Sequence, residues 1–181
     1  MSRALCALAV CGAALVGCGA DVDAADPTSL APPFSGFRVD LTSFVEDGDH
    51  PFADVEGDPI VPCGAGGVTV EAGALEVRTG FCDPADVVSV LPEDAPAGAV
   101  VEVTVSHDNL LADGGQAHLA VVVGDELVFE HGIAMPAASG LIQKRVTMTT
   151  AHAAGERIVF HVHNHGANAY ALRGLVVLPG T

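Results

Sequence analysis

The densest group of side chains that could do chemistry is the run of residues 161–165, which reads His-Val-His-Asn-His. Side chains alternate across a β-strand. His161 and His163 therefore share one face if the apolar residues between 158 and 162 face a core, and His165 joins them if the strand continues. Imidazoles two residues apart on one strand face can jointly ligate Zn²⁺ or Cu²⁺. The spacing thus predicts a metal site or a histidine-lined surface.

Further ligands would have to come from other strands. His118 begins a strongly apolar segment, so a place beside the pair in the same sheet is expected; His107 and His131 are further candidates. The predicted metal set is His161, His163, His165, His118 and His107, and Zn or Cu is the only cofactor indicated. The competing interpretation is structural: the histidines hydrogen-bond to backbone and order the turn-rich residues 164–168. Catalysis without a metal is a third alternative.

No complete catalytic motif accompanies the histidines. The His-x-His pair is similar to the start of the metal sites of cupins and α-type carbonic anhydrases. However, no acidic residue follows Glu156 and no histidine follows His165, so neither activity is inferred. Residues 106–108 (Ser-His-Asp) hold the residue types of a hydrolase triad, but adjacent strand residues point in opposite directions. An enzyme is therefore less expected than a binding protein.

Short apolar segments separated by turns carry these residues. Residues 100–106 alternate between valine and polar side chains, which is typical of a strand with one buried face. Gly124-Asp125 between two such segments favours a type II′ hairpin. Similar strands are expected at 68–70, 75–79, 86–91, 117–123, 127–129, 142–149, 157–163 and 170–178. Because no helix is indicated, the sequence predicts an all-β antiparallel sandwich, jelly-roll-like, over residues 62–181.

The N-terminus carries an export signal. One arginine precedes an apolar run of about 13 residues, which is too short to cross a bilayer and suits a signal peptide. The run ends Leu15-Val16-Gly17-Cys18, which resembles the lipobox of bacterial lipoproteins. The resemblance implies a signal peptide at 1–17, lipid on Cys18 and attachment to the membrane, with Gly19 favouring the outer membrane. The alternative is an ordinary signal peptide cleaved after Ala20 or Ala25.

Lipidation of Cys18 would leave two cysteines in the exported chain. Cys63 and Cys82 are then expected to form a disulfide in an oxidising compartment. Such a bond closes a loop of about 20 residues and stabilises by roughly 3 kcal/mol in the chain-entropy model. A free pair serving as metal ligands is the alternative, although the spacing is far from Cys-x-x-Cys.

Residues 18–61 are interpreted as the lipidated cysteine and an acidic tether. Residues 19–61 hold ten acidic side chains and one basic side chain, Arg38, together with five prolines. Within this segment, residues 37–45 alternate and are a candidate edge strand. The acidic residues between Glu46 and Asp58 could bind Ca²⁺, but they lack EF-hand spacing, so a solvated loop is favoured.

Composition narrows the function classes. The 181 residues carry a formal charge of −16, which excludes a general nucleic-acid binder. The mature domain resembles lipoproteins of high-GC bacteria that have no known reaction. The favoured function is a non-catalytic module that binds an envelope protein or a small ligand. Aromatic residues make up 4% of the chain and none is Trp, which leaves glycan binding as a minor branch. The alternative is a Zn/Cu-binding module, or a metal-dependent enzyme, that uses His161 and His163.

Overall fold

A computed structural model describes residues 33–48, 51–52, 61–111, 115–164 and 166–180. The signal segment, Cys18 and His165 lie outside these residues. The described strands are β1 (Phe37–Arg38), β2 (Val45–Asp47), β3 (Val68–Glu71), β4 (Ala74–Arg78), β5 (Ala85–Val90), β6 (Val100–His107), β7 (Gln116–Val123), β8 (Glu126–Ala134), β9 (Gly140–Thr147), β10 (Arg157–His163) and β11 (Ala169–Leu178). In this part of the chain, no helix has the length and apolar character needed to cross a membrane.

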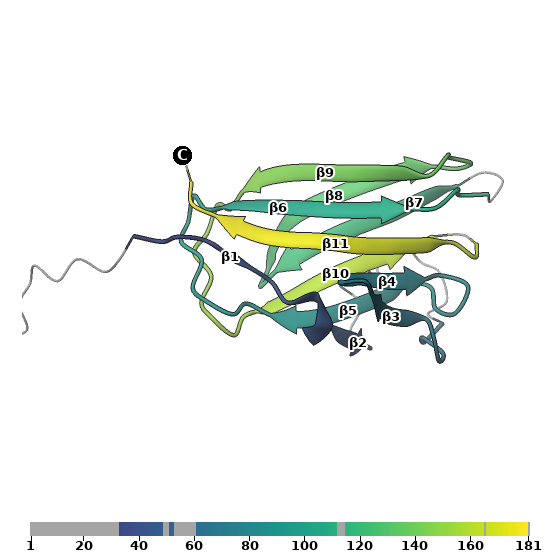
Figure 1. Cartoon of the computed structure of the whole chain (residues 1–181), viewed down its shortest axis with the longest axis horizontal. Coiled ribbons are helices and arrows are strands. Elements are labelled where there is room, and N and C mark those ends of the chain that lie inside the picture. The colour runs from purple at the N-terminus through teal and green to yellow at the C-terminus, as the bar shows by residue number, and fades with distance from the viewer. Residues whose placement is uncertain (1–32, 49–50, 53–60, 112–114, 165, 181) are drawn as a thin grey trace, which may run out of the picture. The chain divides into compact units, whose positions relative to one another are not determined.

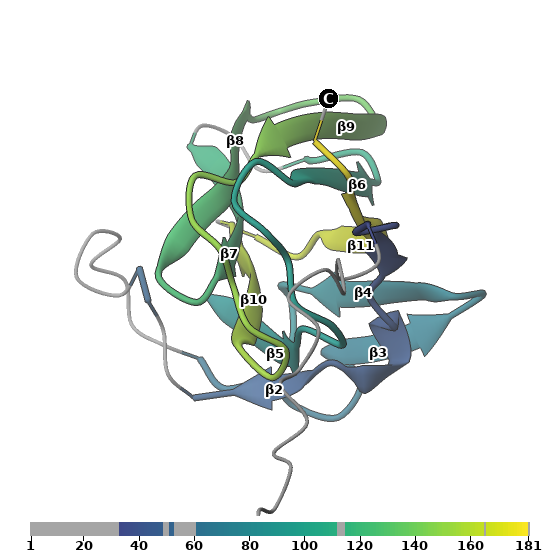
Figure 2. The ribbon, with the colours of Figure 1, turned by 90° about the vertical axis from the view of Figure 1, so that its left-hand side faces the viewer.

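The strands form two antiparallel sheets packed face to face. Sheet A has the order β3-β4-β11-β6-β9, with β1 also paired to β11, and sheet B has the order β2-β5-β10-β7-β8. Figure 1 shows sheet A in front of sheet B, and Figure 2 shows the two layers edge-on. From β4 to β11 the chain passes back and forth between the sheets, except at the β7–β8 hairpin within sheet B, as in a jelly roll. The predicted all-β antiparallel sandwich is therefore confirmed, and so is its disulfide between Cys63 and Cys82.

The core lies between the sheets and is built from alternating apolar residues. Val101, Val103 and Val105 of β6 are buried, whereas the residues between them are half-buried. The alternation predicted for this strand is confirmed. The largest buried side chains include Phe160 of β10 and Tyr170 of β11, one from each sheet.

The segment at 37–45 does more than add one edge strand. It forms β1, a 3₁₀ turn (Leu41–Ser43) and, with the residues that follow, β2. β1 pairs with β11 in sheet A and β2 pairs with β5 in sheet B, so the segment crosses between the sheets. Val39, Leu41 and Phe44 are buried on the way. The sandwich therefore includes residues that precede position 62.

Two tight turns set the register of neighbouring strands. Gly124 joins β7 to β8 with φ +55°, while Asp125 keeps a negative φ, as the predicted II′ turn requires. Ala72 and Gly73 join β3 to β4 with φ of +50° and +77°. Two successive positive φ values define a type I′ turn, in which Asn or Gly is preferred at the position that Ala72 occupies.

Candidate functional site

The histidines of β10 lie on the outer face of sheet B. Ile158, Phe160 and Val162 point into the core, so His161 and His163 point away from it. In the register, His163 lies directly opposite His118 of β7, and His161 lies opposite Asp86 of β5. The prediction that His161 and His163 share a face with His118 as a neighbour is confirmed.

His161 is paired and enclosed. Its Nδ1 lies 2.8 Å from Oδ1 of Asp86, and both side chains are completely buried. The ring of Phe52 packs over the outer face of the sheet, 4.6 Å from the His161 ring and 5.0 Å from the His118 ring. Buried polar and charged side chains need a partner inside the protein, and Asp86 provides this partner for the buried imidazole of His161. Asp86 is thus a side-chain partner of His161, whereas the structural interpretation named backbone partners.

His118 and His163 are closer to solvent than His161. Nε2 of His118 lies 3.1 Å from Oε1 of Glu130, and Nε2 of His163 lies 3.9 Å from Oδ1 of Asp83. His118, Glu130 and His163 border an open depression of about 540 Å³. Within the described ranges, no three His, Cys, Asp or Glu side chains are arranged to hold a metal ion.

The remaining predicted ligand is in the other layer. His107 ends β6 of sheet A, and its Nδ1 lies 2.8 Å from the backbone oxygen of Asp108. Its ring lies beside that of Tyr170, with 6.2 Å between centroids. The structure therefore does not bring His107 to the group formed by His118, His161 and His163.

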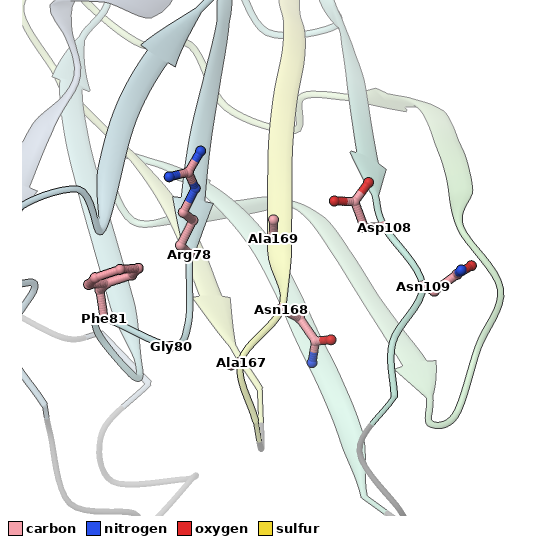
Figure 3. Close-up of a pocket in the computed structure, with 8 residues that line it drawn as sticks. All are labelled: Arg78, Gly80, Phe81, Asp108, Asn109, Ala167, Asn168 and Ala169. Atoms are coloured by element: carbon pink, nitrogen blue, oxygen red, sulfur yellow. The ribbon is translucent and has the colours of Figure 1, made fainter.

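A second depression, which we call the end groove, lies where three loops meet at the end of the sandwich. It has a volume of about 320 Å³. The end groove is lined by Arg78, Gly80, Phe81, Asp108, Asn109, Ala167, Asn168 and Ala169, which Figure 3 shows. Its floor is made of glycine and alanine, and longer polar side chains and one aromatic ring surround it.

Strand register explains this arrangement. Ala169 of β11 pairs with Arg78 of β4 on one side, and its backbone oxygen accepts from the Asp108 amide on the other at 3.3 Å. Arg78 and Asp108 are thus two strand spacings apart, about 10 Å, with a small side chain between them. Figure 3 shows Arg78 and Phe81 on one side of β11, and Asp108 and Asn109 on the other.

A buried polar network fixes the loops around the end groove. The Thr79 amide donates to the Asn168 backbone oxygen at 2.9 Å, and the Asn168 amide donates to Thr79 Oγ1 at 3.1 Å. Nδ2 of Asn164, which is fully buried, also donates to Thr79 Oγ1, at 3.0 Å. The Tyr170 hydroxyl in turn donates to Asn164 Oδ1 at 3.0 Å. Burial, followed by the charge of Asp83, raises the pKa of Tyr170, so the hydroxyl remains a donor.

The disulfide presents the aromatic ring at the rim. Phe81 directly precedes Cys82, and its amide donates to the Arg78 oxygen at 3.0 Å in a tight turn. The Phe81 side chain is half exposed, and it is the one phenylalanine among the exposed large apolar side chains of the described residues. Because the turn is held by a hydrogen bond and a covalent bond, the backbone that carries the ring is fixed at the rim.

The two charges of the end groove differ in their surroundings. Nε of Arg78 lies 2.5 Å from Glu76 Oε1, and a terminal nitrogen lies 3.8 Å from Glu71. The hydrogen bond to Glu76 and the charges of both glutamates raise the pKa of Arg78. Asp108, in contrast, is exposed and forms no ion pair with another described residue. Among the described residues that line the end groove, it is also the one carboxylate.

Sequence reasoning missed both the end groove and a second charged cluster. The sequence predicts only a turn at residues 164–168, and nothing local links Arg78 to Asp108. The second cluster places His152 between two carboxylates: Nε2 lies 3.0 Å from Glu126 and Nδ1 lies 2.8 Å from Glu156. His152 and Glu156 lie four residues apart in the loop before β10, but Glu126 begins β8, so only the folded topology brings Glu126 to them.

Comparison with known proteins identifies the fold. Neither a protein-family model nor a curated protein matches the sequence. TmCBM27, a carbohydrate-binding module described for specific mannan recognition, aligns at 10% identity over 80% of this chain and 96% of its own, with a TM-score of 0.50. The K3 cleaved adhesin domain of Lys-gingipain from Porphyromonas gingivalis w83 aligns at 16% identity over 80% and 98%, with a TM-score of 0.47. At these identities the similarity to TmCBM27 shows a shared sandwich fold.

Proposed function

We propose that this chain is an exported, lipid-anchored envelope protein whose sandwich binds carbohydrate in the end groove without cleaving it. The observation that carries the proposal is the lining of that groove: the half-exposed ring of Phe81 beside a small-residue floor, with amide and carboxylate groups opposite. Amides and carboxylates can hydrogen-bond to hydroxyl groups, and an aromatic ring offers an apolar surface to the carbon face of a sugar. The low aromatic content of the chain makes carbohydrate a less expected ligand, but the lining of this groove favours carbohydrate as the ligand class.

Two further observations support binding without hydrolysis. Glycoside hydrolysis generally uses a pair of carboxyl groups across the scissile bond, whereas Asp108 is the one carboxylate among the described lining residues. The sandwich of TmCBM27, whose described ligand is mannan, also provides a precedent for carbohydrate binding on this fold.

The position of the end groove suits an anchored protein. Gly36 lies against the last residues of β11: a Cβ at Gly36 would lie 2.5 Å from the Val177 oxygen and 3.2 Å from Pro179. The end groove lies at the first residue of that strand, Ala169, and Figure 1 shows the two ends of β11 at opposite ends of the sandwich. The 10 residues of β11 span about 30 Å. The described chain thus enters the sandwich, at Gly36, at the end away from the end groove.

Binding is tested with the chain from residue 19 onward, which contains every described core residue. Titration calorimetry against oligosaccharides of mannose, glucose and galactose should detect binding of at least one series. Phe81→Ala should weaken that binding about tenfold or more, corresponding to at least 1.4 kcal/mol. Val90→Ala removes a similarly exposed apolar side chain from sheet B and should leave the affinity unchanged. Binding by none of the series, or equal binding by the Phe81 variant, would refute the proposal.

Lipid anchoring is tested separately. In a bacterial host, the full chain should partition with membranes and with the detergent phase, because several acyl chains anchor stably. Cys18→Ala should release the protein to the soluble fraction. Complete membrane partitioning of that variant would contradict the lipidation proposal.

The alternative function is binding of Zn²⁺ or Cu²⁺ by His118 and His163. It is favoured by their direct cross-strand pairing and by Glu130 beside His118. It would need further ligands, because His161 is enclosed with Asp86. Stoichiometric metal in the purified chain that is lost in the His118→Ala, His163→Ala double variant would establish this function, and metal-free protein with equal affinity in both forms would exclude it.

A further inference from the structure

The positive and negative charges around the end groove do not cancel, and this imbalance can distinguish ligands by their charge. At the β4 side, the Arg78 guanidinium is neutralised by Glu76 at 2.5 Å and by Glu71 at 3.8 Å. Across the floor, the Asp108 carboxylate is exposed and forms no ion pair in the described part of the chain. Arg173 lines a small neighbouring pocket together with Asp108, but its Nε donates to Ser106 Oγ at 2.6 Å. Counting Arg78 and Arg173 against Asp108, Glu71 and Glu76, the side chains at and around the groove still carry one net negative charge.

On the opposite rim, Asp108 is the group that accepts hydrogen bonds from a ligand. Oδ1 of Asn109 already accepts from the Ser139 amide at 2.8 Å, so Asn109 mainly offers the donors of its Nδ2. An ionised carboxylate only accepts hydrogen bonds. Asp108 therefore has to meet a ligand group that donates, such as a hydroxyl or an ammonium group, and it repels a second carboxylate or a sulfate.

We infer that the end groove selects amine-bearing sugars over neutral sugars and neutral sugars over acidic sugars, with Asp108 as the residue that decides. This inference rests on the carbohydrate-binding function proposed above and names its substrate class. An exposed ion pair contributes modestly, so an amino sugar should bind about two- to fivefold more tightly than its neutral counterpart. An acidic counterpart should bind more weakly by a similar factor.

The experiment uses matched oligosaccharides at pH 6, where the sugar amine is cationic and an ordinary aspartate is ionised. The neutral series that binds in calorimetry is compared with its 2-amino form and its uronic acid form on the same ring and linkage. Asp108→Asn should make the amino and neutral forms bind equally. The Glu71→Gln, Glu76→Gln double variant removes the partners of Arg78 and should raise the affinity for the acidic form. Glu93→Gln, an exposed change in the loop before β6, is the control with no expected effect.

The outcomes separate the two proposals. If none of the neutral, amino or uronic oligosaccharides binds, both carbohydrate binding and its selectivity are refuted. If the neutral form binds but the uronic form binds more tightly, or if Asp108→Asn leaves the amino preference intact, the selectivity inference fails while carbohydrate binding stands. Raised salt provides an independent check, because it should reduce the amino preference and leave binding of the neutral form nearly constant.

Discussion

Glu126 holds two turns together, and its removal tests whether the charged cluster around it stabilises the sandwich. Its carboxylate accepts from the backbone amides and hydroxyls of Thr149 and Thr150 at 2.6–3.2 Å, and lies 3.0 Å from Nε2 of His152. Both ring nitrogens of His152 face carboxylates, since Nδ1 lies 2.8 Å from Glu156. An imidazole donates from both nitrogens only when it is protonated. The two carboxylates favour the protonated imidazole, and they outweigh burial in raising the pKa of His152.

The size of the effect follows from the pKa of Glu126. Burial raises this pKa, but hydrogen bonds from Thr149, His152 and Thr150 outweigh burial and lower it from 4.5 to about 2. This difference corresponds to about 3 kcal/mol of folding free energy. The side chain is 15% exposed, so solvent screening is limited. Because the folded pKa is lower than the unfolded one, the contribution is complete above about pH 4.5 and is lost as the pH falls towards 2.

Glu126→Gln should therefore reduce the free energy of unfolding by about 2–3 kcal/mol at pH 6, since glutamine keeps part of the hydrogen bonding. Urea unfolding across pH 2.5–6 measures the difference from the unsubstituted chain, which should shrink steadily with acid. Glu93→Gln supplies the control for removing an exposed acidic side chain. A loss that stays constant from pH 6 to pH 2.5, or a variant as stable as the original chain at pH 6, would refute this reasoning.

Three other predictions concern stability. Burial lowers the pKa of His152, but Glu126 and Glu156 raise it by more, so the folded pKa lies above the ordinary value of 6.5. The contribution of His152 to stability is therefore complete below pH 6.5 and is lost as the pH rises through the folded pKa. The free energy of unfolding lost in His152→Gln should accordingly decline from pH 6 to pH 9. Asp86→Leu should cost about 3–5 kcal/mol because it leaves the enclosed His161 without its carboxylate, and adding His161→Leu should restore part of the loss; a double variant less stable than the single one would contradict this. Ala72→Gly should increase the free energy of unfolding by about 1 kcal/mol, because Ala72 has a φ of +50° in a type I′ turn. The midpoint of thermal unfolding should therefore rise, and an unchanged or lower midpoint would argue against strain at that position.

Local patterns predicted the placement of the histidines. The alternation of residues 158–163 put His161 and His163 on the face opposite Phe160, and the structure has them there. A local pattern could not predict the partners of those histidines, because the partners come from distant segments of the chain. Asp86 is 75 residues from His161, and it meets His161 only through the register between β5 and β10.

The end groove was out of reach for the same reason. Arg78, Asp108 and Asn168 come from three separate loops or strand ends, and each alone is an ordinary polar residue near a turn. β11 enters between β4 and β6, and its register sets Ala169 between Arg78 and Asp108. The period of each strand predicted the layers, but the order of strands within a sheet depends on pairings between distant segments.

The measurement that tests the central claim most directly is NMR mapping of the chain from residue 19 onward with the oligosaccharide that binds in calorimetry. We expect the amide signals of Gly80, Phe81, Asp108 and Asn168 to shift during the titration, while those around His118 and His163 stay in place. Shifts confined to the outer face of sheet B, or no shifts at saturating sugar, would contradict carbohydrate binding in the end groove.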